Sequence, residues 1–401
     1  MAGRRVVAAT ELGVAPSLLL DVIRLGAAIM VVVGHLSQAR FSTGWPDLTV
    51  YAVNAVTAFF LLSGFVIRYV TVRRSATLTE YLIDRGSRID SVLLPALLLS
   101  LGVDALLAGR VLPGHLLAVA LANLTFTAFS WHHAAVFASN SAMWSLCFEC
   151  VYYLLYGVFF YASGWRRALL LVMTAVVAGP EILALLPVWL AGCALFQVFL
   201  HARQRRWCLP TLAAALAGAG TLMAANASLR ALLLRARLSA MTAVHGWESP
   251  AGLQHTRVAW LLPRVGPGSH VSVNAYVWAV VLFVLLLLGL LMADRCSADE
   301  TRGSARVIRL LAEATFPLYL VHLPVLFLVV AVVGHPLHTD VARVVVLLAI
   351  LVLSAWLGVV CNRWKMQLRA WLLRGEWSNL KLLGDSLLAG FGGKQEARAR
   401  S

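Results

Sequence analysis

The stretch LDVIRLGAAIMVVVGHLSQARF, residues 20–41, decides the class of fold. It is apolar over about the 20 residues that a helix needs to cross a bilayer, and yet it contains Arg24 and His35. A charged side chain at the centre of a membrane helix costs roughly 3 kcal/mol on insertion scales. The stretch therefore predicts a membrane span in which Arg24 and His35 either have a function or reach the membrane surface.

The composition of the whole chain is that of a polytopic membrane protein. Of its 401 residues, 61% are hydrophobic and 13% are charged, whereas about a quarter of the residues of a soluble domain are charged. The net charge of +15 does not indicate a nucleic-acid partner, because Lys and Arg gather in the cytoplasmic loops of membrane proteins. No cleavable signal is expected, since the first apolar run is long enough to remain as a span.

The apolar runs predict an all-α fold of about ten transmembrane helices with both termini in the cytoplasm. The expected spans lie near residues 17–38, 50–72, 91–109, 144–162, 167–184, 186–201, 208–226, 273–293, 312–334 and 341–362. If the apolar segment 114–130 also crossed, most later basic loops would lie outside, against the positive-inside rule. It is therefore expected to be re-entrant or interfacial, on the outer face. The loop 227–272 departs from the rule, because it falls outside yet contains several arginines. Part of it could be an interfacial helix.

This arrangement divides the chain into three parts. They are a cytoplasmic N-terminus (1–16), a membrane domain (17–362) and a basic cytoplasmic tail (363–401).

Arg24 and His35 are expected on nearly one face of the first helix. They are eleven residues apart, which is about three turns and about 16 Å along the helix axis. Asp21 lies one turn before Arg24 and could pair with it. Either residue alone could instead extend to the nearer membrane surface. Their shared face favours a functional pair.

Three further arginines lie at the inner ends of the second and third spans. Arg68 ends the second span, and Arg85 and Arg88 stand three apart at the mouth of the third. That spacing places two guanidinium groups side by side on a helix, and guanidinium binds phosphate in a bidentate way. Each of these arginines is equally consistent with a charge that only orients the helix. Gly64, in the second span, would allow a close approach of two helices.

Ser145, Glu149 and Tyr153 follow one another at one-turn spacing in the fourth span. An acid just inside the outer boundary needs a partner or a cavity, and Glu149 is expected at the depth of His35. A carboxylate can orient an imidazole, as in a general-base dyad. His322, near the middle of the ninth span, is either a packed histidine or a pocket residue.

No bound metal or resident cofactor is expected. The sequence contains no HExxH, Walker or GxGxxG motif. Cys147 and Cys150 have CxxC spacing but lie within an apolar segment without a second pair, which favours ordinary packed thiols.

Five segments resemble, in order, the motifs of the acyltransferase-3 family of integral membrane acyltransferases. They are LDVIRLGAAIMVVVGH, AFFLLSGFVI, RGSR, WSLCFECVYYLLY and FPLYLVHLPVL. Two details differ from the family pattern: RIDS stands where the family has RIYP, and CFEC replaces a more polar sequence around the acid.

The resemblance implies transfer of an acyl group, commonly acetyl, from cytoplasmic acyl-CoA to a hydroxyl of a lipid-linked or exported glycan. It implies a multi-pass protein of the bacterial inner membrane, with acyl-CoA as a substrate and membrane lipids around it. His35 corresponds to the essential histidine, here the general base held by Glu149, and Arg24 to its partner. Arg85 and Arg88 correspond to the pair near the donor. The other residues expected to bind substrate are Arg68, Ser145, Tyr153 and His322.

Two other functions fit the same residues. Arg24, His35 and Glu149 could form the proton or substrate path of a secondary transporter, or the fold could serve as a non-catalytic membrane partner. Release of coenzyme A on turnover would distinguish the enzyme from both. Direct transfer and a covalent acyl-histidine both remain open.

Overall fold

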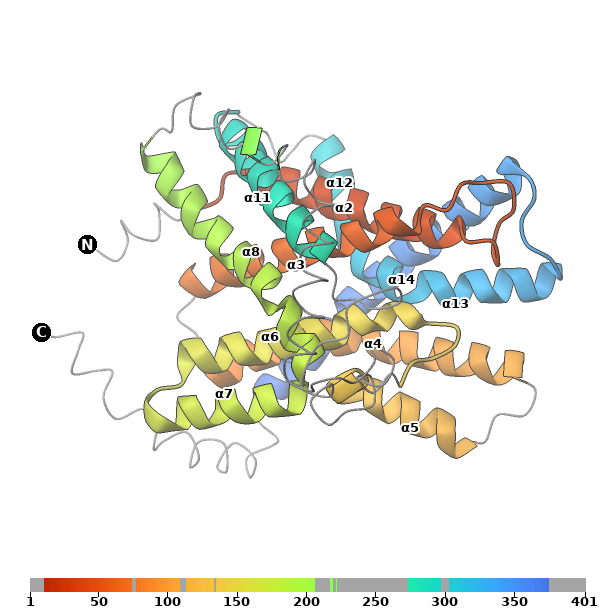
Figure 1. Ribbon diagram of the computed structural model, residues 1–401, viewed down its shortest axis with the longest axis horizontal. Helices are drawn as coiled ribbons and strands as arrows, with labels where there is room; N and C mark the ends of the chain where they lie inside the picture. The colour runs from red at the N-terminus through yellow and green to blue at the C-terminus, as the bar shows by residue number, and fades with distance from the viewer. Residues whose placement is uncertain are drawn as a thin grey trace, which may run out of the picture.

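The computed structural model describes eight stretches of the chain, and these stretches are mostly helical. These stretches are residues 11–73, 77–108, 113–132, 135–205, 217–218, 221, 273–296 and 303–374. Within them the only strand-like pairings are isolated bridges, so the all-α expectation is confirmed. Figure 1 shows a bundle in which most long helices run roughly along one direction, with α8 and α11 inclined to it.

Eight of the described helices are long and apolar enough to cross a membrane. They are α2 (Val14–Leu36), α3 (Thr49–Arg73), α4 (Leu78–Ala108), α6 (Trp144–Tyr161), α8 (Pro180–Arg205), α11 (Val273–Ala293), α13 (Thr315–Val333) and α14 (Asp340–Arg374). Each corresponds to one of the expected spans. The expected span 208–226 and the loop 227–272 lie outside the described residues, apart from 217–218 and 221.

The expected span 167–184 is not a single long helix. Its first part is α7 (Gly164–Ala178), which has 15 residues and is therefore about 22 Å long, short of the roughly 30 Å hydrocarbon core. Gly179, at a φ of +79°, ends α7, and Pro180 begins α8. Proline is favoured at the first position of a helix, so this Gly-Pro pair divides the apolar run into two helices.

The segment 114–130 is also short of a span. Its helix is α5 (Pro113–Leu124), with 12 residues, or about 18 Å. This length agrees with the expectation that the segment does not cross the membrane. Two single-turn helices, η1 (Ser130–His132) and η2 (Ser141–Met143), then lead into α6.

Helices α3 and α8 are in backbone contact at two glycines. A Cβ atom on Gly64 would lie 2.1 Å from the carbonyl oxygen of Trp189, and one on Gly192 would lie 2.1 Å from the carbonyl oxygen of Leu61. Small residues in membrane helices allow such an approach. The expectation for Gly64 is confirmed, and the contact fixes α3 against α8 beside the site described below.

The two ends of the bundle differ in charge. At the end where α2 begins, called here the arginine end, ion pairs join Arg203 to Asp294 (2.8 Å) and Arg369 to Asp84 (2.5 Å). The amphipathic helix α12 (Gly303–Glu313) also lies there, and its Arg309 contacts Asp21 of α2 at 2.7 Å.

At the end where α2 finishes, called the histidine end, the loop after α2 is joined to the loop before α14. Arg343 is buried there and donates hydrogen bonds to Ser42 (2.7 Å) and Asp340 (2.5 Å). The Thr49 hydroxyl and backbone N–H donate to Asp47 and lower the pKa of its carboxyl, so that Asp47 is ionised at the start of α3.

Candidate active site

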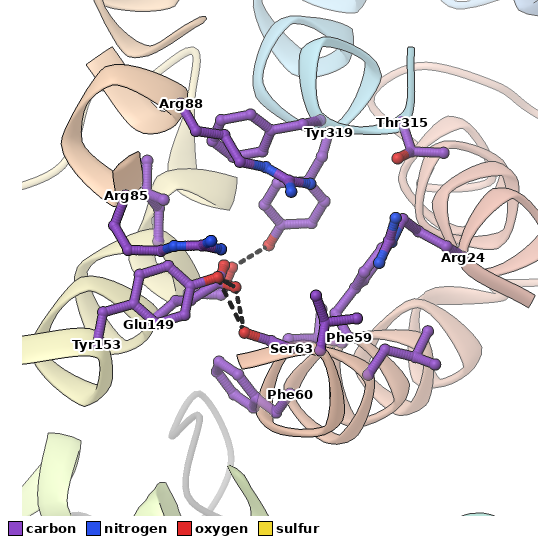
Figure 2. A pocket seen from close by; sticks show the side chains of 16 residues that line it. Arg24, Phe59, Phe60, Ser63, Arg85, Arg88, Glu149, Tyr153, Thr315 and Tyr319 are labelled. Atoms are coloured by element: carbon purple, nitrogen blue, oxygen red, sulfur yellow. Dashed lines mark hydrogen bonds between the residues drawn. The ribbon is translucent and has the colours of Figure 1, made fainter. Parts of the chain in front are cut away.

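A pocket inside the bundle brings together polar residues from five helices (Figure 2). The central pocket, as it is called here, lies between α2, α3, α4, α6 and α13. Its polar lining residues are Arg24, Ser63, Arg85, Arg88, Ser145, Glu149, Tyr153, Thr315 and Tyr319. Six of these nine positions were expected from the sequence to be catalytic or substrate-binding residues. Ser63, Thr315 and Tyr319 were not.

Glu149 is held by hydroxyl groups. The Ser63 hydroxyl donates to Oε1 of Glu149 at 2.5 Å, and the Tyr153 hydroxyl donates to the same oxygen. The indole N–H of Trp189 donates to the Ser63 oxygen at 3.1 Å. No described residue donates a hydrogen bond to the other carboxylate oxygen, Oε2. The network therefore orients the carboxylate and leaves one of its oxygens for a ligand.

Three guanidinium groups surround this carboxylate. Figure 2 shows Arg85 and Arg88 reaching in from α4 and Arg24 from α2 on the opposite side. Arg24 pairs with Asp21 at 3.6 Å. In the described part of the chain, Arg85 and Arg88 form no ion pair, and the buried Nε of Arg85 has no hydrogen-bond partner. Cationic groups thus outnumber carboxylates in the pocket, which suits a phosphate or another anion.

A second pocket adjoins the central one at the arginine end. Arg24 and Arg88 line both pockets. The remaining charged residues of this basic vestibule are Asp21, Arg309, Glu313 and Lys365. Because the two pockets share lining residues, a long ligand can lie with a charged part in the vestibule and a narrower part in the central pocket.

Ser145 and Tyr319 form the part of the pocket between α6 and α13. The Tyr319 hydroxyl donates to the carbonyl oxygen of Ala142 at 3.0 Å. It therefore accepts the hydrogen bond from Ser145, which is 2.6 Å away. This contact ties the first turn of α6 to α13 and places the Tyr319 ring in the pocket wall.

His35 lies near a second histidine and not at Glu149. Its Nδ1 atom is 2.9 Å from the carbonyl oxygen of Val31 and 3.2 Å from Nε2 of His322, and the two ring centroids are 5.0 Å apart. His322 is fully buried, and its ring centroid is 6.2 Å from that of Tyr319. Tyr319 thus stands between the histidine pair and the central pocket.

The expected pairing of His35 with Glu149 is therefore wrong, because the two residues differ in depth. Thr49, at the start of α3, lies near Gly34 beside His35, whereas Ser63, the partner of Glu149, comes about four helical turns later. The chain before α6 is also buried: the Asn140 side chain donates to the carbonyl oxygen of Leu320 at 2.8 Å. Helix α6 therefore starts inside the bundle rather than at its outer boundary.

Arg68 is the one expected binding residue that lies apart from both the pocket and the histidine pair. Its guanidinium donates to the Tyr156 hydroxyl at 3.3 Å and packs 5.8 Å from the centre of the Phe160 ring. Arg68 does not line the central pocket or the vestibule. It is five residues after Ser63, which places it on another face of α3.

Asp104 positions the chain before α6 and was missed in the sequence. It is buried, and its two carboxylate oxygens accept hydrogen bonds from the backbone N–H groups of Ala138 and Ser139, each at 2.8 Å. An acid inside an apolar run was the signal that could have found it. The His35–His322 contact had no such signal, because it joins two helices far apart in the chain.

Comparison with known proteins gives one kind of match. A family model described as an acyltransferase domain matches residues 18–363. The matched range includes every residue that lines the central pocket, together with His35 and His322. No curated protein and no solved structure matches the chain.

Proposed function

The chain belongs to the acyltransferase-3 family, and from this premise we propose that it moves an acyl group from acyl-CoA to a hydroxyl of a carbohydrate-containing acceptor. Acetyl is the acyl group that the family resemblance favours. The acceptor is a lipid-linked or exported glycan. The observation that carries the proposal is the pair of adjoining pockets that share Arg24 and Arg88.

The shape and charge of these pockets suit an acyl-CoA donor. Its phosphates would bind in the basic vestibule, where Arg88, Arg309 and Lys365 supply positive charge. Its pantetheine arm is uncharged and narrow and would extend past Arg24 into the central pocket. The arm contains amide N–H groups, and Oε2 of Glu149 is an acceptor for one of them. In this proposal Glu149 positions the donor and does not orient His35.

The acceptor would react at the histidine end. His35 is about 16 Å from Arg24 along α2, so the thioester at the tip of the arm has to pass Tyr319 to reach it. His35 takes the proton of the acceptor hydroxyl, whose oxygen attacks the thioester carbonyl. The carbon–sulfur bond breaks and coenzyme A leaves. An N–H donor near the carbonyl would stabilise the negative charge that develops on its oxygen.

This reaction sets the orientation in a bacterial inner membrane. Acyl-CoA is cytoplasmic, so the arginine end faces the cytoplasm and the histidine end faces the opposite side. The positive-inside rule independently favours this orientation, because the arginine end carries most of the basic residues of the described chain.

The decisive experiment follows labelled acetyl-CoA. Purified protein in nanodiscs is given the donor with and without lipid-linked glycan from a host cell, and the wild type is compared with His35→Ala. Histidine-dependent label on the glycan, with release of coenzyme A, is the expected result. Label on the protein alone would identify an acyl-enzyme. Absence of donor turnover, also with longer acyl groups, would contradict the proposal and favour the transporter.

A truncated donor tests the vestibule separately. Acetyl-pantetheine lacks the phosphates, so it should react with a much higher KM than acetyl-CoA, and the difference should shrink at high salt. Equal KM values for the two donors would mean that the vestibule does not bind phosphate.

A further inference from the structure

We propose that His322 is a positioning residue that holds His35 as the Nδ1-protonated tautomer, so that Nε2 of His35 is the nitrogen that reacts. This inference rests on the proposed function for its catalytic meaning. The tautomer itself follows from the contacts of the two imidazole rings and can be measured without any turnover.

The proton position on His322 is fixed by backbone carbonyls. Its Nδ1 atom lies 3.1 Å from the carbonyl oxygen of Leu318 and 2.9 Å from that of Tyr319. Carbonyl oxygens only accept hydrogen bonds, so Nδ1 carries the proton. A second proton on this fully buried ring would create a charge that no carboxylate of the described residues contacts. His322 is therefore neutral, and its Nε2 atom is an acceptor.

The same argument fixes the proton on His35. Its Nδ1 atom faces two acceptors, the carbonyl oxygen of Val31 at 2.9 Å and Nε2 of His322 at 3.2 Å. A proton on Nδ1 satisfies both contacts. A lone pair on Nδ1 would face two other lone pairs. One assignment thus explains all four ring contacts, and it leaves Nε2 of His35 unprotonated.

This tautomer gives His322 a part in the reaction. When Nε2 of His35 takes the proton of the acceptor hydroxyl, the ring becomes an imidazolium and its Nδ1–H still donates to His322. The new oxygen–carbon bond forms, the carbon–sulfur bond breaks, and the proton on Nε2 passes to the departing coenzyme A sulfur. His322 thus occupies the position that a carboxylate has in a Ser-His-Asp triad, but as a neutral acceptor.

The first test reads the tautomer directly. Protein with ¹⁵N-labelled histidine is placed in nanodiscs at neutral pH, and the His35 signals among the 11 histidines are assigned from the His35→Asn spectrum. The expected result is a protonated Nδ1 and an unprotonated Nε2 on His35. A protonated Nε2 in the wild type would overturn the inference, whether or not the protein shows transfer activity.

The second test compares two substitutions of His322. His322→Gln keeps an oxygen that can accept from His35, whereas His322→Leu removes the acceptor at similar volume. We expect His322→Leu to lower kcat by about 10²–10⁴-fold with an unchanged KM for acyl-CoA, and to give a mixture of His35 tautomers. His322→Gln should stay within roughly tenfold of the wild type. His115→Gln is the matched control, because His115 is exposed on α5.

The outcomes separate the two proposals. If His35→Ala abolishes transfer but His322→Leu keeps both the wild-type kcat and the wild-type tautomer, the Val31 carbonyl suffices and the role of His322 is refuted. If the wild type transfers nothing, the proposed function fails, and the tautomer measurement still decides the histidine pair. If His322→Leu does not fold, the two His322 variants cannot be compared. The ¹⁵N spectrum of the wild type and the kcat of His322→Gln then decide: a loss well beyond tenfold in His322→Gln refutes the acceptor role.

Discussion

Glu149 is stabilised inside the bundle by neutral groups and not by a guanidinium in direct contact. A buried carboxylate needs hydrogen bonds to offset its lost hydration, and Ser63 and Tyr153 both supply them to Oε1. The nearby arginines are then left for a ligand. This is the arrangement that a binding site requires, since a carboxylate paired with Arg88 would compete with an incoming phosphate.

The hydroxyl network predicts coupled effects on activity. Ser63→Ala and Tyr153→Phe should each lower kcat/KM by roughly tenfold, because each removes one hydrogen bond that orients Glu149. The double substitution should show a coupling energy of about 0.5–3 kcal/mol in a double-mutant cycle. Tyr156→Phe is the control, since Tyr156 bonds Arg68 and not Glu149. Strict additivity would mean that the two hydroxyls act separately.

The arginines predict a second result at this scale. Arg88→Lys should raise the KM for acyl-CoA, because Arg88 lines the vestibule and lysine cannot form the bidentate contact of a guanidinium with phosphate. Arg68→Lys should leave this KM unchanged and lower thermal stability instead, since Arg68 packs against Phe160. Steady-state kinetics over a range of donor concentrations would check both. A raised KM in Arg68→Lys alone would restore the interpretation that the sequence suggested.

Individual residues were predictable where their chemistry conflicts with their surroundings. Arg24 and Glu149 stand out because a charge within an apolar run requires an explanation. Their partners were not predictable in the same way. The expected depth of Glu149 assumed that α6 starts at the outer boundary, whereas the chain just before α6, at Asn140, is already buried inside the bundle. Arg68 lies in an equally apolar context, and only its aromatic neighbours show that it is not in the pocket.

At the scale of the elements, helix α3 depends on glycine for its position. Gly64→Ala should destabilise the protein by about 1–3 kcal/mol or more, because the new methyl group would overlap a backbone oxygen of α8 and not a movable side chain. Gly102→Ala in α4 is the control, because the added Cβ atom would meet no described residue outside its own helix within 4 Å. Alanine also has a higher helix propensity than glycine. Thermal unfolding in detergent would distinguish them. Equal unfolding temperatures would contradict the close contact.

The segment before α6 gives a prediction of its own. Asp104→Asn should lower the free energy of unfolding by about 1.5–3 kcal/mol. Its amide nitrogen would face one of the two backbone N–H groups that now donate hydrogen bonds to the carboxylate. It should also lower kcat/KM, since this segment leads directly into the helix that carries Glu149. The conservative Asp90→Asn, on the same helix, serves for comparison. Full activity in Asp104→Asn would show that the start of α6 is fixed by other contacts.

The length of the apolar runs predicted most of the long helices, but it predicted the residues at which they begin and end only in part. The run 167–184 is apolar enough to suggest one span, but Gly179 and Pro180 favour a break between two helices, and the structure has one. For 114–130 the distribution of charge predicted a segment that does not cross, because a crossing there would reverse every later loop, and the 12-residue length of α5 agrees with this prediction. Apolar content alone would have suggested a membrane span in both segments.

At the scale of the whole molecule, the difference between the two ends connects the fold to the reaction. The arginine end carries the vestibule, and in the proposed reaction the histidine end carries the nitrogen that reacts, so donor and acceptor would approach from opposite sides of the membrane. The distribution of basic loops predicts this polarity from the sequence. The route between the ends was not predictable, because it depends on side chains from α2, α3, α4, α6 and α13 that only the packed bundle brings together.

Cysteine labelling tests this orientation. Cys296 is exposed and follows α11 at the arginine end, where neighbouring Asp294 pairs with Arg203. The experiment uses a variant that also carries Cys208→Ser, so that Cys208 does not contribute to the labelling. In this variant, Cys296 should react with a membrane-impermeant maleimide only after the membrane is permeabilised. An exposed thiol at the histidine end, introduced as His335→Cys in a protein that also has Cys296→Ser, should react in intact spheroplasts. The two positions are separated by roughly the length of α2, whose 23 residues span about 34 Å. The reverse labelling pattern would place the basic vestibule away from cytoplasmic acyl-CoA, and the proposed direction of transfer would then be wrong.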